Sequence, residues 1–305
     1  MDLSLLRNPE NWRDIVREVV VHGLVVVPRD RRRLLDRRWR GLDELRRLGS
    51  ADTVIVSYGK SGRTWLRVMV SRYFQRRYAL PEGQALEFDN LYRLNPRVPR
   101  ILFTHANYIR DATGHWDNRA EFRSKRVLLL VRDPVDTAVS QYYQWRHRMR
   151  GWKKILNDYP PPGAESSIFD FVMSERCGLP KIVDYLAVWE RELPHLRQHE
   201  VVSYEEMRKD AAAPLMRVLR FFGEEPSEAE IADAVAYGSL ENMRALEATG
   251  GIAFAGRRMK PGSSDPQSFK TRRGKVGGWR DEFTPDQIAT IEAWLAGQAP
   301  LPFGY

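Results

Sequence analysis

The sequence of 305 residues contains one cysteine, Cys177, and no apolar run long enough to cross a membrane. A single cysteine excludes a disulfide within the chain and a metal cluster held by several thiolates. A membrane span needs roughly 18 apolar residues, whereas the most apolar stretch, residues 19–27, is short and is interrupted by a histidine and a glycine. It also lacks the placement and cleavage site of a signal peptide. We therefore expect a cytoplasmic protein without a transmembrane segment.

Lysine is scarce as well, because nine of the 49 basic residues are lysine and the others are arginine. The net charge is +9, and the isoelectric point is about 9.7. This excess favours an anionic partner without indicating whether it is a nucleotide, a sugar acid, a membrane or nucleic acid. A hydrophobic content of 43% with nine tryptophans is enough for a full core and excludes a disordered chain.

The most informative stretch is residues 53–73. Residues 53–57, TVIVS, are typical of a buried strand, and from Thr64 onward apolar residues recur at helical spacing. Gly59 and Gly62 lie in the turn between the two. A strand, tight loop and helix point backbone N–H groups and the positive end of a helix dipole at one spot, which suits a phosphate or sulfate.

This loop does not have the order of a Walker A loop, in which glycine and four residues precede Gly-Lys-Ser/Thr. Here Lys60 comes before the second glycine, and no Gly-Lys-Ser/Thr follows. An ordinary turn with a solvated lysine is the alternative interpretation of this segment alone.

Further elements can be predicted from periodicity and from breaker residues. Strands are expected at 101–105, 127–131 and 200–204, and helices at about 134–148, 168–176, 180–192, 205–222, 227–236, 239–248 and 285–296. Irregular connections are expected at 79–99, 106–124, 151–166 and 249–278. Strands alternating with helices predict an α/β fold, a three-layer parallel sheet with flanking helices and a P-loop-like strand-loop-helix.

Four side chains with chemical potential follow the predicted strands, namely Lys60, His105, Arg132 and Tyr204. Parallel strands end at one edge of a sheet, and ligands of such sheets bind beyond that edge. We therefore expect these four residues to converge on one site.

The chain is expected to be a single domain, with residues 1–50 as an arginine-rich, mostly helical extension and residues 51–305 as the core. Residues 29–47 place apolar side chains at helical intervals among arginines. They predict an amphipathic helix with a basic outer face, which could dock on the main domain or bind a membrane surface or polyanion.

Three segments resemble those of the PAPS-dependent sulfotransferases, PAPS being 3′-phosphoadenosine 5′-phosphosulfate. Residues 58–66, YGKSGRTWL, resemble the family's 5′-phosphosulfate loop. Residues 131–140, VRDPVDTAVS, resemble its 3′-phosphate segment, and residues 272–279, RRGKVGGW, resemble its C-terminal signature. The resemblance implies sulfuryl transfer from PAPS to a hydroxyl, or an amine, by in-line displacement, with the desulfated nucleotide PAP as product and no metal.

The resemblance also implies residue roles. Lys60 would neutralise charge on the leaving phosphate, and His105 would act as general base. A histidine that is merely held by hydrogen bonds at a strand end is the alternative for His105. Backbone amides of residues 61–65 would hold the 5′-phosphate. The full set expected to contact the nucleotide is Ser61, Gly62, Arg63, Thr64, Trp65, Arg132, Ser140, Tyr204, Arg272, Arg273 and Gly274. We expect the segment 249–278 to become ordered when nucleotide binds.

The sequence departs from the animal steroid and phenol sulfotransferases of this family. Phe103 stands where those enzymes have a lysine two residues before the histidine, and Arg63 replaces a threonine. Their C-terminal dimer motif (Lys, then Thr-Val, then Glu) maps onto Arg280, Thr284, Pro285 and Ala289, of which only Thr284 matches it. The chain therefore resembles a bacterial-type branch, and its oligomeric state stays open.

The acceptor also stays open. The expected partner is a small molecule, such as a phenol, lipid, sugar or natural-product hydroxyl, and not a nucleic acid. Aromatic residues that could wall its pocket or pack in the core are Tyr108, Trp116, Trp145, Trp152 and Phe169. Alternative functions are a P-loop kinase or phosphotransferase, and a non-catalytic polyanion-binding protein using residues 29–47.

Overall fold

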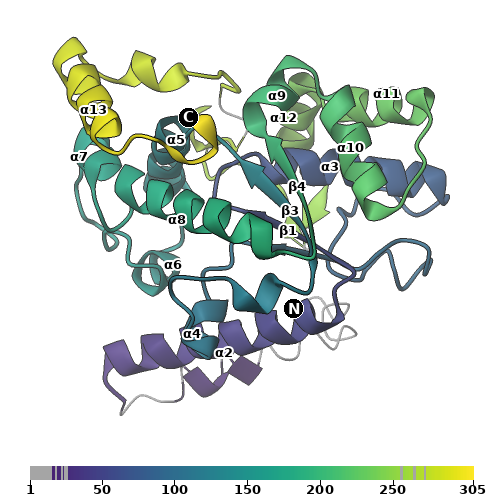
Figure 1. Cartoon of the computed structure of the whole chain (residues 1–305), viewed down its shortest axis with the longest axis horizontal. Helices are drawn as coiled ribbons and strands as arrows, with labels where there is room; N and C mark the ends of the chain where they lie inside the picture. The colour runs from purple at the N-terminus through teal and green to yellow at the C-terminus, as the bar shows by residue number, and fades with distance from the viewer. Residues whose placement is uncertain are drawn as a thin grey trace.

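The computed structural model describes residues 16–17, 19–21, 23, 27–254, 257–263, 266–270 and 273–305. Four parallel strands lie in the order β2-β1-β3-β4, surrounded by helices (Figure 1). They are β1 (Thr53–Ser57), β2 (Ile101–Thr104), β3 (Arg126–Val131) and β4 (Gln198–Ser203). The predicted parallel α/β sheet is therefore confirmed, with strand bounds shifted by one or two residues.

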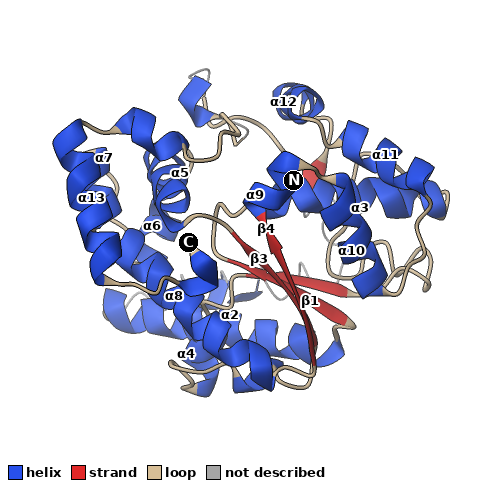
Figure 2. Ribbon diagram, turned by 45° about the horizontal axis from the view of Figure 1, so that its top comes forward, coloured by secondary structure: helices blue, strands red, loops and turns tan. Residues whose placement is uncertain are grey.

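The core lies on both faces of the sheet, because successive strand residues point to opposite sides. Val54 and Val56 of β1 pack with Trp189 on one face, whereas Ile55 packs with Met69 on the other. All five residues of β1 are buried. Helices α5 (Pro134–His147) and α8 (Leu179–Glu192) cover the first face, and α3 (Arg63–Arg77) and α10 (Ala212–Phe222) cover the second (Figure 2).

The remaining described helices and short strands complete the two flanking layers. They are α2 (Arg29–Ser50), α4 (Ile109–Thr113), α6 (Gly151–Leu156), α7 (Ile168–Met173), α9 (Tyr204–Lys209), α11 (Glu228–Tyr237), α12 (Leu240–Thr249), α13 (Pro285–Gly297), β5 (Ala253–Phe254) and β6 (Arg257–Arg258). Two predicted loops were wrong in part, because α4 lies within 106–124 and α6 within 151–166. Both helices are only five or six residues long, which is too short for a periodic apolar pattern.

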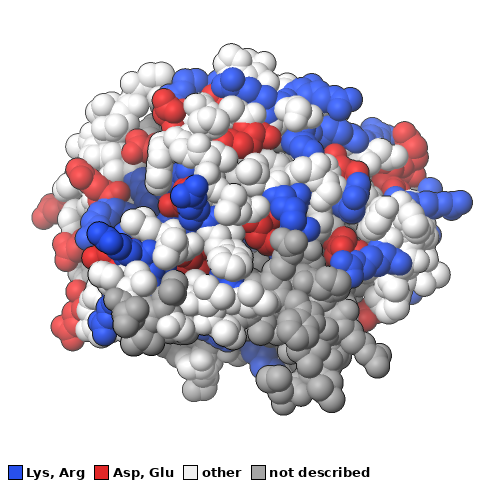
Figure 3. Space-filling model, turned by 90° about the horizontal axis from the view of Figure 1, so that it is seen from below, with Lys and Arg blue, Asp and Glu red and all other residues white. Residues whose placement is uncertain are grey.

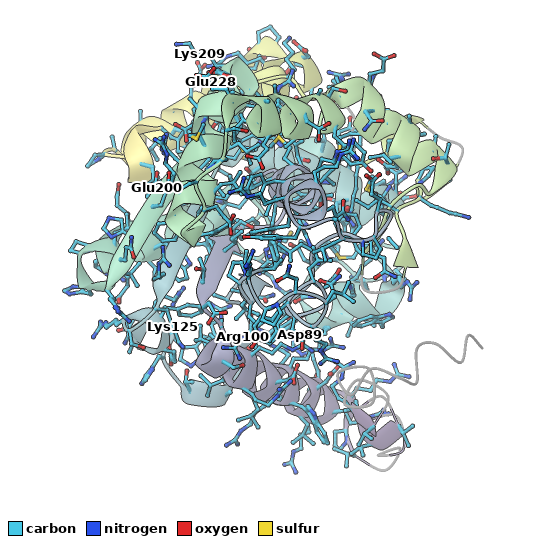
Figure 4. The ribbon with its side chains drawn as sticks, turned by 90° about the vertical axis from the view of Figure 1, so that its right-hand side faces the viewer. Asp89, Arg100, Lys125, Glu200, Lys209 and Glu228 are labelled. Atoms are coloured by element: carbon cyan, nitrogen blue, oxygen red, sulfur yellow. The ribbon has the colours of Figure 1, made fainter. Side chains whose placement is uncertain are left out.

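Helix α2 docks against α4 and carries Arg37, Gly41 and Leu48 on its buried face. At Gly41 the backbones approach so closely that an added Cβ would lie 2.3 Å from the Tyr108 carbonyl oxygen. Lys125, which precedes β3, donates to the Gly49 carbonyl oxygen at 2.9 Å. Figure 4 shows Lys125 and Arg100 beside this helix. The docking alternative for residues 29–47 therefore holds for this face.

The outward face of α2 is not uniformly basic. Arg40 pairs with Asp36, and Arg46 and Arg47 both pair with Asp43. On the surface seen from this side, basic and acidic side chains are interspersed over the described residues (Figure 3). Among the described residues, no helix is long and apolar enough to cross a membrane.

Candidate functional site

A cavity of about 1110 Å³ opens where β1, β2 and β3 end. Lys60, His105, Arg132 and Tyr204, which follow the four strands in turn, all line this cavity. Strand β1 lies between β2 and β3. The connections after β1 and after β2 therefore lead to opposite sides of β1, and the cavity lies at this change in strand order. That is where ligands of open α/β sheets bind.

The loop between β1 and α3 turns through two left-handed residues. Lys60 has φ 77° although it carries a side chain, and Gly62 has φ 92°. A Cβ at Gly62 would lie 2.7 Å from the Tyr204 ring, so both the backbone angle and the close approach require glycine. The first-turn amides of α3 lack acceptors within the helix. The amide of Trp65, however, donates to the Gly62 carbonyl oxygen at 2.9 Å, which removes it from the amides expected to hold a phosphate.

Lys60 lies among other cations. Burial lowers its pKa to about 7, with further lowering by the charges of Lys270, Arg148 and Arg132. Burial and the neighbouring charge of Arg148 also lower the pKa of Lys270, to about 8. Lys270 lines the cavity, and sequence reasoning missed it because it lies in an aperiodic segment. Crowded cations of this kind are relieved by a bound anion.

Arg132 bridges the loop and the sheet edge. Its Nη1 donates to the Lys60 carbonyl oxygen at 3.0 Å, and its guanidinium lies 4.2 Å from the centroid of the Tyr204 ring. Its Nη2 lies 3.7 Å from an oxygen of Asp136. The Nε atom is buried and has no hydrogen-bond partner. Arg132 is thus held in place while one donor stays unused.

His105 is held at both ring nitrogens. Nδ1 lies 2.7 Å from the Ser57 carbonyl oxygen, and Nε2 lies 2.9 Å from Nη2 of Arg63. Because a carbonyl only accepts, Nδ1 carries the proton and Nε2 accepts from the guanidinium. Burial and then the charge of Arg63 lower the pKa of His105 to about 3. The imidazole is therefore neutral, with the lone pair of Nε2 turned toward Arg63.

Asp111 of α4 is a second candidate for the base, six residues after His105. Its carboxylate accepts from Nε and Nη2 of Arg37 at 2.9 and 2.8 Å, and both side chains are 8% exposed. A carboxylate engaged in this way is fixed by α2 and is poorly placed to take a proton.

Trp65 and Tyr204 form an aromatic corner beside the loop. Their rings meet edge to face, with centroids 5.9 Å apart. The Trp65 indole N–H donates to the Gly238 carbonyl oxygen at 2.6 Å, which fixes the ring. Ser140 and Thr64 also line the cavity, while Ser61 is buried at 2% exposure.

The C-terminal segment is tied to the start of α5. Asp136, which is 4% exposed, accepts from the amides of Gly277 and Trp279 at 2.8 and 3.0 Å. Arg273 and Gly274 thereby line the cavity, and the Arg273 guanidinium lies 3.2 Å from Glu282. Arg272 lies outside the described residues. The role of Asp136 as an anchor was not predicted, because nothing near it in the sequence indicates its distant partners.

The expected acceptor residues separate into two groups. Tyr108 and Trp116 line the cavity. Trp145 does not, because it is 1% exposed and packs with Phe171 and Cys177 in a small core cluster, where its indole N–H donates to the Pro160 carbonyl oxygen. Placing Trp145 in the acceptor wall was therefore wrong, and its core alternative holds.

Comparison with known proteins supplies the family. The family model described as "Sulfotransferase domain" matches residues 50–299. Sulfotransferase 6B1 of Homo sapiens is 25% identical over 246 residues, covering 77% of this chain and 72% of that protein. Luciferin sulfotransferase of Photinus pyralis is 22% identical over 275 residues, covering 80% and 70%. Both relatives are animal proteins, so the bacterial-type branch stays a prediction.

A solved structure of mouse sulfotransferase SULT7A1 complexed with PAP is similar in fold. It is 20% identical, with a TM-score of 0.55, and the match covers 85% of this chain and 90% of that one. The family match spans most of the chain, and the described strands, loop and cavity agree with it. The chain therefore belongs to the sulfotransferase family of enzymes.

Proposed function

We propose that this enzyme transfers a sulfuryl group from PAPS to the hydroxyl of a small-molecule acceptor, with Lys60 and His105 as its catalytic residues. The observation that carries the proposal is the convergence of Lys60, His105 and Arg132 on one cavity, at the ends of adjacent strands. Sulfuryl transfer, like phosphoryl transfer, depends mainly on positioning and on stabilising charge.

The residues present fit a polyanionic nucleotide. The charge of Lys270 adds to the effect of burial in lowering the pKa of Lys60, and Arg63 Nη1 and Arg132 Nε are buried donors without partners among the described residues. Arg132, Ser140 and the segment 273–274 would hold the 3′-phosphate, and the Trp65–Tyr204 corner would contact the adenine. The amides of residues 61–64, with the Thr64 hydroxyl, would hold the 5′-phosphate.

PAPS, when bound, supplies the sulfuryl group and leaves as PAP. The protein contributes a base that accepts a proton and a cation that stabilises negative charge. His105 takes the acceptor hydroxyl's proton at Nε2, once Arg63 yields that atom to the hydroxyl. Lys60, charged by the proximity of the phosphates, stabilises the oxygen that becomes negative as its bond to sulfur breaks.

Residues 1–50 are proposed to belong to the same functional unit as residues 51–305. Arg37 of α2 holds Asp111 and donates to the carbonyl oxygens of Leu156 and Asn107. Arg37 and Arg40 also line the cavity. A polyanion-binding role for a separate N-terminal helix finds less support in these contacts.

The test compares binding of PAP with binding of ATP and Mg²⁺ by isothermal titration, followed by transfer from labelled PAPS to a panel of hydroxylated and amino acceptors. We expect tight binding of PAP, weak binding of ATP, and a labelled sulfate ester. Preference for ATP with Mg²⁺ would instead indicate a phosphotransferase.

A further inference from the structure

The cavity extends beyond His105 into an end rich in arginine and tyrosine. Helix α4 begins four residues after His105 and carries Arg110, and Arg119 lies in the connection that follows. Lys181 comes from α8, close enough to Arg110 for that charge to lower its pKa. All three side chains line the cavity, and we call them the distal cations.

The distal cations lack acidic partners. Among the residues that the structure describes, none of the three forms an ion pair with a carboxylate, in contrast to Arg37 on the neighbouring helix, which binds Asp111. Arg119 is 4% exposed, and it donates only to the backbone oxygens of Trp116 and Asn118. Lys181 donates to the Arg176 carbonyl oxygen. A cation removed from water in this way is costly unless a negative group accompanies it.

Two buried donors remain unused at this end. The Nε atoms of Arg110 and Arg119 are shielded from solvent and have no hydrogen-bond partner. The Arg110 guanidinium lies 4.8 Å from the centroid of the Trp116 ring. Burial lowers the pKa of both arginines, with further lowering by the charge of Arg37 at Arg110 and by the charge of Arg110 at Arg119.

Tyrosines lie between the distal cations and the end of the cavity that contains Lys60 and His105. Tyr58 directly precedes the loop that carries Lys60, and its ring meets that of Tyr185 edge to face at 5.2 Å. Burial raises the pKa of Tyr185, against the lowering effect of Arg119 and of Arg63. Tyr185 therefore lies within electrostatic reach of both the residue bound to His105 and the distal cations.

Acidic residues offset this charge only in part, because Asp111 acts on Arg110 and Asp158 on Lys181 without an ion pair, and burial remains the larger effect on the pKa of both cations. Asp158, Glu175 and Asp184 are the carboxylates that line the same end among the described residues. Asp158 is already paired with Arg33 and lies 3.7 Å from Arg176, while Glu175 and Asp184 are exposed.

From these contacts we propose that the acceptor is an anionic molecule, an aromatic hydroxyl compound whose carboxylate, phosphate or sulfate group binds Arg110, Arg119 and Lys181. The hydroxyl would reach His105 while the ring lies along Tyr58 and Tyr185. A planar guanidinium suits all three anions because it donates in pairs to their oxygens. This inference rests on the proposed function, since it names the substrate class of the same site.

The test uses para-substituted phenols of one length that end in a carboxylate, a phosphonate, a methyl ester or a primary ammonium group. The kcat/KM for transfer from labelled PAPS is measured for each. We expect the anionic phenols to exceed the neutral ester by about tenfold or more, as one charge-assisted contact provides. Arg110→Gln should lower this ratio clearly without bringing it to one, because Arg119 and Lys181 remain, and Arg110→Lys should restore part of it.

The matched control is Arg176→Gln, which removes the same charge from a side chain that is 78% exposed at the cavity rim. It should keep the preference for anions. At the buried Arg119 we substitute lysine rather than a neutral residue, because loss of the charge there would endanger folding. Arg119→Lys should lower the preference for anionic phenols while PAP binding stays unchanged.

Equal kcat/KM for neutral and anionic phenols in the wild type, or an unchanged ratio in Arg110→Gln, overturns the inference but leaves sulfuryl transfer intact. Failure to bind PAP would overturn the proposed function itself. If the enzyme sulfates none of the phenols, the test is their affinity for the protein saturated with PAP. Anionic phenols that bind no better than the neutral ester would then contradict the role of the distal cations.

Discussion

Nη2 of Arg63 lies 2.9 Å from Nε2 of His105, the ring atom that would take the acceptor's proton. The first-turn arginine of α3 therefore competes with the acceptor for the base. It also keeps the imidazole neutral, because its charge adds to the effect of burial on the pKa of His105.

Substituting Arg63→Thr should raise the pKa of His105 from about 3 toward the ordinary value of 6.5, without reaching it, because burial remains the larger cause. The imidazole resonances of His105, followed by NMR across pH 3 to 8, measure this. A pKa of His105 that stays near 3 in the variant would show that Arg63 does not influence it.

Substituting His105→Ala should lower transfer to an alcohol or phenol by about 10²–10⁴ while leaving the affinity for PAP nearly unchanged. In the proposed function the loop and Arg132 would still hold the phosphates in this variant. Turnover with labelled PAPS and titration with PAP give the two numbers, and His195→Ala is the matched control. A variant that keeps most of its turnover would assign the base to another group and return His105 to a structural role.

Lys60→Ala and Arg132→Ala should affect different steps. In the proposed roles Lys60 would act where charge develops during the reaction, so kcat should fall more than PAP affinity. Arg132 would contact a phosphate away from the reaction, so PAP affinity should fall more than kcat. Lys209→Ala, an exposed lysine on α9 (Figure 4), is the control. Similar small losses in both parameters for both variants would contradict these roles.

PAP binding should take up protons at pH 8. Lys60 with a pKa of about 7 and Lys270 with a pKa of about 8 are largely or half neutral there, and bound phosphates raise both values. PAP affinity should therefore weaken as the pH rises through 7 and 8. Calorimetry in buffers of different ionisation enthalpy counts the protons, and Lys60→Met should lower the count. An uptake of zero in the wild type would disprove this coupling.

Glu44 should make the protein less stable as the pH rises from 4.5 to 7. Burial raises its pKa from 4.5 to about 7, so the folded protein binds a proton that the unfolded chain has released. Below pH 4.5 this group does not reduce the free energy of unfolding. As the pH rises through 7, the free energy of unfolding falls by on the order of 2–3 kcal/mol. Glu44→Gln should remove this loss, whereas the exposed Glu225→Gln should retain it, as measured by urea unfolding at pH 5 and 8.

Much of the fold follows from local pattern. The β-branched run 53–57 and the apolar run 127–131 could hardly be other than buried strands, and the placement of Lys60, His105, Arg132 and Tyr204 at one edge follows from parallel topology. Helices α4 and α6 were missed because a turn or two of helix held by tertiary contacts leaves no periodic signal.

Contacts between distant segments could not be read from the sequence. Trp145 is a large aromatic residue of the type that often lines pockets, but its neighbours Phe171 and Cys177 place it in the core. The interaction of Arg63 with His105, and of Lys270 with Lys60, joins residues far apart in the chain. Such pairs depend on how the layers pack, which local residue preferences do not determine.

The anchoring of Asp136 has a consequence for handling the protein. Two amides near the C-terminus satisfy a carboxylate that is almost fully buried and that shares its neighbourhood with Arg132. Shortening the chain before residue 277 would leave that carboxylate without its amide donors, and it would draw Arg132 away from the Lys60 carbonyl oxygen. A C-terminal truncation that removes Gly277 and Trp279 would then disturb Arg132 at the cavity, although Lys60 and His105 had not been changed.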